Sequence, residues 1–175
     1  MDASQPLPRL WLMTDERQSD SLFDAVARLP VGAGVVFRHY ATEPEERRRL
    51  FDAVRATRRD LLLLLAGPAE DAQAWGADGS HGRGAGQGLR TAPVHDLAEL
   101  REAEASGAAA IFMSPAFETR SHPGAPVLGI EGFGTLAAEA RVPVIALGGM
   151  TAERFALLKG AHGWAAIDAW TPEQR

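Results

Sequence analysis

The stretch Val142-Pro-Val-Ile-Ala-Leu-Gly-Gly-Met-Thr-Ala-Glu-Arg-Phe155 joins an apolar run to a helix start through two glycines. Its run at residues 144–147 is typical of a strand buried on both faces. Gly148 and Gly149 end this strand, and Thr151 stands where a helix N-cap is expected. Free backbone N–H groups beside glycines at a helix start favour an anion-binding cup. A tight turn that needs only small residues is an equally good interpretation.

The same order of strand and helix extends along the chain in both directions. Strands are predicted at residues 9–15, 34–38, 61–66, 79–81, 90–95, 109–115, 144–147 and 165–168. Helices are predicted at residues 21–29, 42–59, 69–76, 96–107 and 133–141, and again from residue 151. Alternating strands and helices with continuous apolar strands indicate a parallel sheet. Eight such units predict a compact α/β protein with the (β/α)₈ TIM barrel fold, and a doubly wound open sheet is the second choice.

Two crossovers depart from a regular barrel. The glycine-rich segment 82–88 leaves almost no helix in the fourth crossover, and only seven residues follow the last strand. The eighth helix is therefore expected to be missing. Two helix starts carry a capping-box pattern, Thr42 with Glu45 and Asp96 with Glu99. The basic residues 47–49 are expected to form a solvated helix face.

Composition limits the classes of function. The chain has 175 residues and a formal net charge of −5, without a long run of one sign, which argues against nucleic acid or membrane as the main partner. It has no cysteine, and no apolar run approaches the ~18 residues of a membrane span. Residues 1–8 are expected to be a tail and residues 9–175 a single barrel domain. A cytoplasmic protein is expected.

Both candidate folds bind ligands at the carboxyl ends of the strands. Candidate site residues are therefore Asp15, Arg38, His81, His95, Ser114, the loop residues Thr119, Ser121 and His122, the pair Gly148 and Gly149, and Asp168. Arg38 could bind a ligand or pair with Asp15 or Asp168. The three histidines could act as general acids or bases or be plain polar residues. Their spacings match no metal motif.

Several motifs resemble those of thiamine-phosphate synthases and their thiazole-tautomerase relatives. The segment 114–123, Ser-Pro-Ala-Phe-Glu-Thr-Arg-Ser-His-Pro, is similar to that family's Gly-Pro-Ile-Phe-x-Thr-x-Thr-Lys loop. Ala-Asp-Gly-Ser-His at 77–81 resembles Ala-Asp-Gly-Val-His, and Ile-Ala-Leu-Gly-Gly-Met at 145–150 resembles Ala-Ile-Gly-Gly-Ile. Leu-Met-Thr-Asp at 12–15 and Val-Val-Phe-Arg at 35–38 fall where the family has Leu-Ile-Thr-Asp and Val-Gln-Leu-Arg-Glu-Lys. The resemblance covers nearly the whole chain and implies a (β/α)₈ barrel.

The resemblance also implies a reaction. A synthase of this family joins hydroxymethylpyrimidine diphosphate to thiazole phosphate and releases pyrophosphate, with Mg²⁺ and basic groups stabilising the leaving group. The implied partner is thus a small phosphate ligand. The implied roles are catalytic for Arg38, His81 and His122, phosphate-binding for Thr119, Ser121, Gly148 and Gly149, and pocket-lining for Asp15, His95, Ser114 and Asp168.

The chain departs from the family pattern where the diphosphate and the metal would bind. The departures are Val36 for Gln, Tyr40 for Lys, Ala66-Gly67 for Asn-Asp, the neighbourhood of Gly86 for a second metal-binding Asp, His122 for Lys and Asp168 for Ser. The usual carboxylate ligands of magnesium are missing. A synthase with an altered site, a tautomerase-like enzyme and a non-catalytic binding protein all remain open.

Trp164 and Trp170 flank the last predicted strand. They are interpreted as packing or interface residues, because no eighth helix would cover that side. An uncovered apolar flank favours self-association, and a homodimer is expected.

Overall fold

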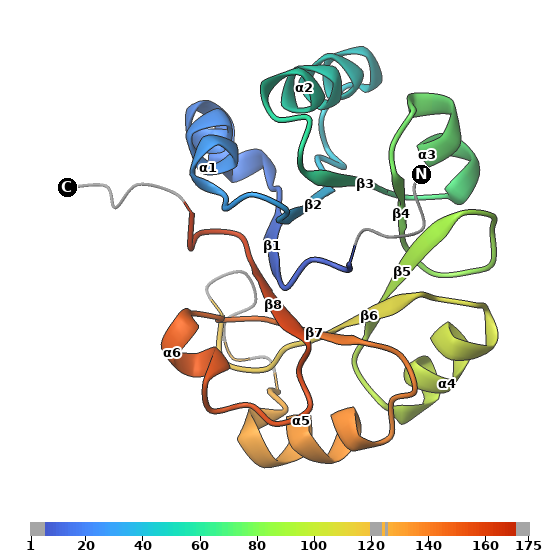
Figure 1. Cartoon of the computed structure of the whole chain (residues 1–175), viewed down its shortest axis with the longest axis vertical. Helices are drawn as coiled ribbons and strands as arrows, with labels where there is room; N and C mark the ends of the chain where they lie inside the picture. Colours follow the sequence, from blue (N-terminus) through green and yellow to red (C-terminus); the bar gives the residue numbers. More distant parts are fainter. Residues whose placement is uncertain (1–5, 120–123, 125, 171–175) are drawn as a thin grey trace.

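A computed structural model describes residues 6–119, 124 and 126–170 (Figure 1). Eight parallel strands form a closed barrel in chain order, with β8 paired to β1 through Leu10 and Trp164. The strands are β1 Leu10–Met13, β2 Gly34–Phe37, β3 Leu62–Ala66, β4 Gly79–His81, β5 Leu89–Val94, β6 Ala110–Met113, β7 Val144–Leu147 and β8 Gly163–Ala166. The predicted (β/α)₈ barrel is confirmed, and the open sheet is excluded by the β1–β8 pairing.

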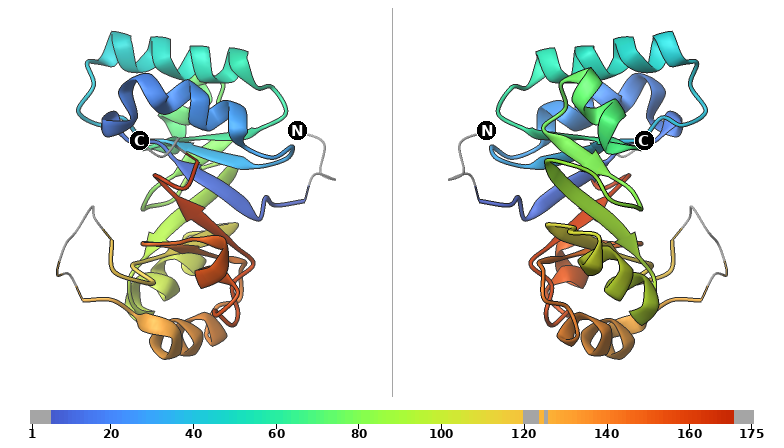
Figure 2. Two further views of the ribbon diagram at one scale, coloured as in Figure 1. Left: turned by 90° about the vertical axis from the view of Figure 1, so that its left-hand side faces the viewer. Right: turned by 90° about the vertical axis from the view of Figure 1, so that its right-hand side faces the viewer.

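Helices surround the barrel in most crossovers, and Figure 2 shows α1 and α2 at one end of the long axis and α5 at the other. They are the 3₁₀ helix η1 Glu16–Ser21 and the α-helices α1 Leu22–Arg28, α2 Pro44–Thr57, α3 Ala69–Trp75, α4 Leu97–Ala105, α5 Gly129–Ala138 and α6 Ala152–Phe155. As predicted, no helix lies between β4 and β5, and none follows β8 as far as residue 170. Among the described residues, no helix is long and apolar enough to cross a membrane.

The predicted N-cap is present at the start of α4 and absent at the start of α2. Asp96 caps α4 as predicted, because its side chain accepts a hydrogen bond from the Glu99 N–H. The prediction that Thr42 caps α2 was wrong. The N-cap is Glu43, whose side chain makes no capping hydrogen bond. Pro44 explains the difference, because its fixed φ suits the first helical position and keeps the preceding residue extended.

The barrel interior is filled by side chains. Trp11 and Phe112 are fully buried there, with ring centroids 5.2 Å apart in an edge-to-face contact. Gly34 leaves the space for the indole, because a Cβ at that position would lie 2.2 Å from the Trp11 ring. A ligand can therefore bind only above this core, at the carboxyl ends of the strands, which we call the mouth of the barrel.

A buried arginine anchors the segment that connects β4 to β5 without a helix. Arg90 on β5 is 4% exposed, and its guanidinium donates hydrogen bonds to the carbonyl groups of Gly84 and Ser106. It thus ties the glycine-rich segment to the end of α4. The same segment packs on α3, where a Cβ added to Gly86 would lie 2.4 Å from the Cβ of Ala69.

Two tryptophans occupy the flank beside β8. Trp164 is 6% exposed, and its ring stacks on that of Trp170 with centroids 5.5 Å apart. Their packing interpretation is confirmed. Their role in an interface stays a prediction.

Candidate active site

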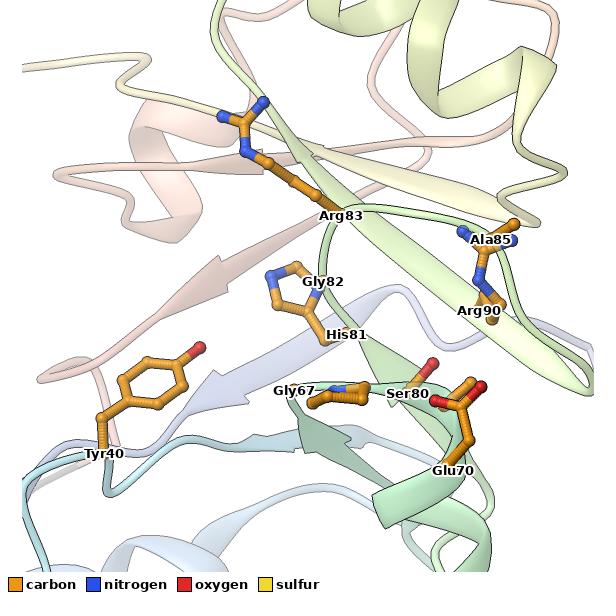
Figure 3. A pocket seen from close by; sticks show the side chains of 11 residues that line it. Tyr40, Gly67, Glu70, Ser80, His81, Gly82, Arg83, Ala85 and Arg90 are labelled. Carbon is orange, nitrogen blue, oxygen red and sulfur yellow. The ribbon is translucent and has the colours of Figure 1, made fainter.

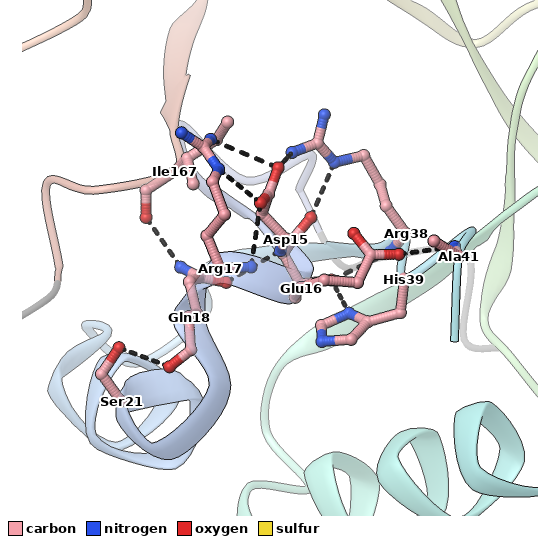
Figure 4. Close-up of polar contacts among 10 residues, drawn as sticks. Asp15, Glu16, Arg17, Gln18, Ser21, Arg38, His39, Ala41 and Ile167 are labelled. Carbon is pink, nitrogen blue, oxygen red and sulfur yellow. Dashed lines mark hydrogen bonds and ion pairs between the residues drawn. The ribbon is translucent and has the colours of Figure 1, made fainter. Parts of the chain in front are cut away.

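An ion-pair network joins the ends of β1 and β2 (Figure 4). Arg38 donates from Nε to the carbonyl oxygen of Thr14 at 2.7 Å and from Nη2 to Asp15 Oδ2 at 3.0 Å. Asp15 also accepts a hydrogen bond from Arg17 Nε at 2.7 Å. Of the alternatives that the sequence left open for Arg38, the structure therefore contains the pair with Asp15. One carboxylate thus lies between two guanidinium groups, and the negative charge of Glu16 also acts on Arg38.

Burial and neighbouring charges shift the pKa of Asp15 in opposite directions. Burial would raise the pKa of Asp15, but the hydrogen bonds and charge of Arg17, helped by Arg38, lower it below its usual value. The hydrogen bond with Asp15 raises the pKa of Arg17, and the charge of Asp168 is a smaller cause in the same direction. Asp168 itself is exposed beyond β8. Its negative charge thus acts on the β1 side of the mouth.

His39 is a part of this network that the sequence analysis missed. It is 3% exposed and has a positive φ of 42°, and its ring stacks on Phe37 with centroids 4.7 Å apart. Its Nδ1 lies 2.9 Å from Thr14 Oγ1, which also accepts a hydrogen bond from the Arg38 N–H. Burial lowers the pKa of His39. The buried imidazole therefore fixes the backbone from which Arg38 extends.

Arg47 on α2 supports the same corner. It donates from Nε to the carbonyl of Arg38 at 2.9 Å and from Nη2 to the carbonyl of Ala66 at 2.8 Å. Its guanidinium also lies 5.2 Å from the Trp75 ring centroid. The prediction of a purely solvated basic face was wrong for this residue. The reason is the position of α2, which places Arg47 over the ends of β2 and β3.

His81 is a buried histidine at the end of β4. It is 6% exposed, its Nδ1 lies 2.9 Å from Thr91 Oγ1, and its ring meets Phe112 edge-on at 4.8 Å. Burial, helped by the positive charge of Arg38, lowers the pKa of His81 to about 3. The imidazole is therefore neutral at pH 7. It can donate or accept a hydrogen bond, but it is not a protonated acid.

A cavity of about 320 Å³ lies beside His81, above the ends of β3 and β4. Figure 3 shows Tyr40 and Arg83 on opposite sides of it, with the His81 ring directed between them. The lining residues are Tyr40, Gly67, Pro68, Ala69, Glu70, Ser80, His81, Gly82, Arg83, Ala85 and Arg90. Gly67 adds no side chain to one wall of the cavity, at a position where the family resemblance implies an Asp.

His95 lies apart from this cavity. It is exposed, and its Nδ1 lies 2.7 Å from Glu99 Oε2, while Glu99 Oε1 accepts a hydrogen bond from Arg83 at 2.6 Å. Burial alone would raise the pKa of Glu99, but the hydrogen bonds from His95 and Arg83 outweigh it and lower the pKa. Glu99 therefore connects His95 to an arginine that lines the cavity.

The glycine pair after β7 forms a tight turn against the loop that follows β6. Gly148 and Gly149 have positive φ values of 98° and 60°. A Cβ on Gly149 would lie 2.3 Å from the carbonyl oxygen of Glu118. The Gly148 carbonyl accepts a hydrogen bond from the Phe117 N–H at 3.1 Å, and the Gly149 carbonyl accepts one from Arg154. The tight-turn interpretation is therefore confirmed.

The N–H groups of this turn leave the anion-cup interpretation open. Among the described residues, none accepts a hydrogen bond from the N–H of Gly148 or Gly149. Thr151 is the N-cap of α6 as predicted, with its side chain accepting from the Arg154 N–H at 3.3 Å. Anion binding at the glycine pair stays a prediction.

The other predicted site residues are placed as follows. Ser114 is half-buried at the end of β6, where its N–H donates to the Val94 carbonyl at 2.9 Å. Thr119 is half-buried in the loop after β6. Ser121 and His122 lie outside the described residues, so their predicted roles stay predictions.

The described residues offer few ligands for a protein-held magnesium ion. Across residues 6–119, 124 and 126–170, no three His, Asp or Glu side chains are grouped to hold a metal. Asp15 is already paired with two arginines, and Glu70 is the single carboxylate on the cavity wall. These residues do not fit a metal held mainly by the protein.

Comparisons with known proteins agree with the resemblance. A family model described as thiamine monophosphate synthase matches residues 89–170. The chain is 31% identical to "Putative thiamine-phosphate synthase 2" of Aquifex aeolicus, over 92% of this chain and 96% of that protein. It is 36% identical to a thiamine-phosphate synthase of Pyrococcus horikoshii, over 45% of this chain and 39% of that enzyme. A solved thiamine phosphate pyrophosphorylase from Pyrococcus furiosus has the same fold, with a TM-score of 0.76 at 24% identity over 95% of this chain and 89% of that one.

Proposed function

Because this chain belongs to the thiamine-phosphate synthase family, we propose that it joins hydroxymethylpyrimidine diphosphate to thiazole phosphate in thiamine biosynthesis. In this reaction the bond between the pyrimidine methylene and the diphosphate oxygen breaks, and pyrophosphate leaves. The thiazole nitrogen then forms a bond to the methylene carbon. The observation that carries the proposal is the cavity at the mouth, which is lined by Arg83 and by His81, on which the charge of Arg38 acts.

The chain's own part in the reaction would be to stabilise the leaving group. Charge that develops on the diphosphate needs donors that are already in place, because reorienting them during the reaction costs free energy. Arg38 meets this requirement, since Thr14 and Asp15 hold its guanidinium at 2.7 and 3.0 Å. The face of Tyr40 on the opposite wall would favour the cation-like methylene.

The second substrate would bind at the glycine pair. The N–H groups of Gly148 and Gly149 would donate to the thiazole phosphate, and Thr119 lies in the neighbouring loop. This arrangement puts the phosphate on the β7 side of the mouth and the diphosphate on the β2–β4 side. The two substrates would then face each other across the barrel axis.

Magnesium stays a prediction from the resemblance, because the carboxylates of the described residues do not fit a protein-held ion. A cytoplasmic location and a homodimer are further parts of the proposal. Size-exclusion chromatography with light scattering tests the dimer, and a mass equal to one chain would overturn it.

The activity is tested by mixing the purified protein with both substrates and Mg²⁺ and measuring thiamine phosphate and pyrophosphate. We expect the two products in equal amounts, and Arg38→Gln should lower the rate at least tenfold. Arg48→Gln is a matched control, because Arg48 pairs with Asp52 on the outside of α2. An absence of product at high protein concentration would overturn the proposed activity.

A further inference from the structure

His39 and Thr14 form a buried hydrogen-bonded pair next to Arg38. Thr14 Oγ1 lies 2.9 Å from His39 Nδ1 and also accepts a hydrogen bond from the Arg38 N–H at 2.9 Å. Thr14 is 0% exposed and His39 is 3% exposed, so these polar groups need partners within the protein. A chain of hydrogen bonds therefore connects the imidazole, through one hydroxyl group, to the backbone of Arg38.

The Thr14 hydroxyl group determines which nitrogen of this imidazole carries the proton. A hydroxyl group can donate one proton and can accept at two lone pairs. The Arg38 N–H occupies an acceptor position, and among the described residues His39 Nδ1 is the group placed to accept the hydroxyl proton. Since a buried donor without an acceptor destabilises the fold, the hydroxyl donates to Nδ1. The neutral imidazole therefore carries its own proton on Nε2.

The backbone of Arg38 is held on both sides. Its N–H is bonded to Thr14, and its carbonyl oxygen accepts a hydrogen bond from Arg47 Nε at 2.9 Å. The next residue, His39, has a φ of 42° and stacks on Phe37 with an interplanar angle of 6°. Figure 4 shows the His39 ring and the Arg38 side chain extending in different directions from the end of β2. The guanidinium thus extends from a backbone that the imidazole helps to hold.

Charged groups of both signs act on the imidazole. Asp15 at the end of β1 and Glu16 on η1 favour its protonation, whereas Arg38 and Arg47 oppose it. Burial has the largest effect and lowers the pKa of His39 below its usual value. The imidazole is therefore neutral at pH 7, as its role as an acceptor requires.

We propose that His39 is a positioning residue for Arg38, because its neutral imidazole accepts the Thr14 hydroxyl proton and so holds the Arg38 backbone in place. The importance of this role for catalysis rests on the proposed function. Arg38 is already paired with Asp15, so His39 adds no contact to a ligand. Its contribution is to keep that pair at a fixed place at the edge of the mouth.

The first test is the protonation of the imidazole in the full chain. Nitrogen-15 NMR at pH 7 should show His39 with a bare Nδ1 and a protonated Nε2, and His39→Asn identifies its signals among those of the five histidines. A proton on Nδ1 would overturn the proposal. This measurement needs neither substrate nor a stable variant with a smaller side chain.

The second test compares two substitutions that both tolerate a positive φ. The carboxamide oxygen of His39→Asn can replace Nδ1 as the acceptor, whereas His39→Gly offers none. The protection of the Arg38 amide against hydrogen exchange should fall about tenfold in His39→Gly and should be retained in His39→Asn. His162→Gly is the matched control, at a histidine bonded to the Leu7 carbonyl, and should protect Arg38 as the parent does. Equal protection in both His39 variants would overturn the role of the acceptor.

The third test is the rate of thiamine phosphate formation. His39→Gly should lower kcat about tenfold with the KM for thiazole phosphate unchanged, and His39→Asn should restore most of kcat. Circular dichroism of each variant excludes misfolding as the cause of a loss. Product formation at the parent's kcat by His39→Gly would overturn the positioning role and leave the proposed function standing. If the parent forms no product, the proposed function fails, and the NMR and exchange measurements still decide whether His39 holds Arg38.

Discussion

Replacing His81 with glutamine should flatten the dependence of stability on pH. In the unfolded chain this imidazole has a pKa near 6.5, whereas in the folded barrel its burial lowers the pKa to about 3. Between these values the unfolded chain binds a proton that the folded chain does not. Stability from this group is therefore complete above pH 6.5 and is lost as the pH falls toward 3.

The size of the effect follows from the pKa difference. Each pH unit within this window changes the free energy of unfolding by about 1.4 kcal/mol. Between pH 7 and pH 5 the parent should therefore lose about 2 kcal/mol through His81. Glutamine has no titrating group but keeps a polar atom for Thr91, which now lies 2.9 Å from the imidazole. The variant is expected to be less stable at pH 7, yet to lose about 2 kcal/mol less on acidification.

Urea unfolding followed by tryptophan fluorescence provides the assay, since Trp11 is fully buried in the barrel. The free energy of unfolding is measured at pH 7 and pH 5 for the parent, for His81→Gln and for a control, His162→Gln. His162 is half-buried and hydrogen-bonded to the Leu7 carbonyl at 3.1 Å, so this variant shows the effect of losing a histidine other than His81. An equal loss in His81→Gln and in the parent would refute the reasoning.

Three further predictions address the mouth and its loops. Arg38→Gln should weaken pyrophosphate binding in calorimetry about 10- to 100-fold, because a charged hydrogen-bonding group is lost, and unchanged affinity would contradict this. Gly149→Ala should destabilise the chain by about 1–3 kcal/mol in urea unfolding, since φ is +60° and Glu118 blocks the new methyl group. Gly134→Ala, in an open position within α5, should instead be neutral or stabilising by up to about 1 kcal/mol, and an equal loss in both would refute the strain argument. Arg90→Met should speed proteolytic cleavage within residues 82–88, mapped by mass spectrometry, because their anchor is gone; an unchanged rate would count against that role.

The sequence was sufficient for the architecture because the relevant signals are local. The run Leu61–Ala66 is apolar at every position, and it forms β3 over Leu62–Ala66. The glycines at 82–88 correctly predicted a crossover without a helix. Even the Thr42 error was local, since Pro44 next to the predicted cap carries the signal that decides the helix start.

Contacts between residues that are far apart in the sequence were harder to predict from the sequence. His39 was missed because nothing in the sequence around it indicates a positive φ or a stack on Phe37. Arg47 was assigned to solvent because an arginine on a helix is usually solvated, yet α2 brings it to the carbonyl groups of Arg38 and Ala66. These contacts join residues that only the closed barrel makes neighbours.

The sequence by itself determined the eight strands, the crossover without a helix between β4 and β5, the family and the ends of strands at which a ligand must bind. Hydrophobic periodicity and glycine placement act within a few residues, so they can be read from one chain. Only the tertiary structure decided that Arg38 pairs with Asp15, that His81 is buried and neutral, and that Ser80 opens into a cavity. Those outcomes depend on the desolvation and charge that distant segments supply when the barrel closes.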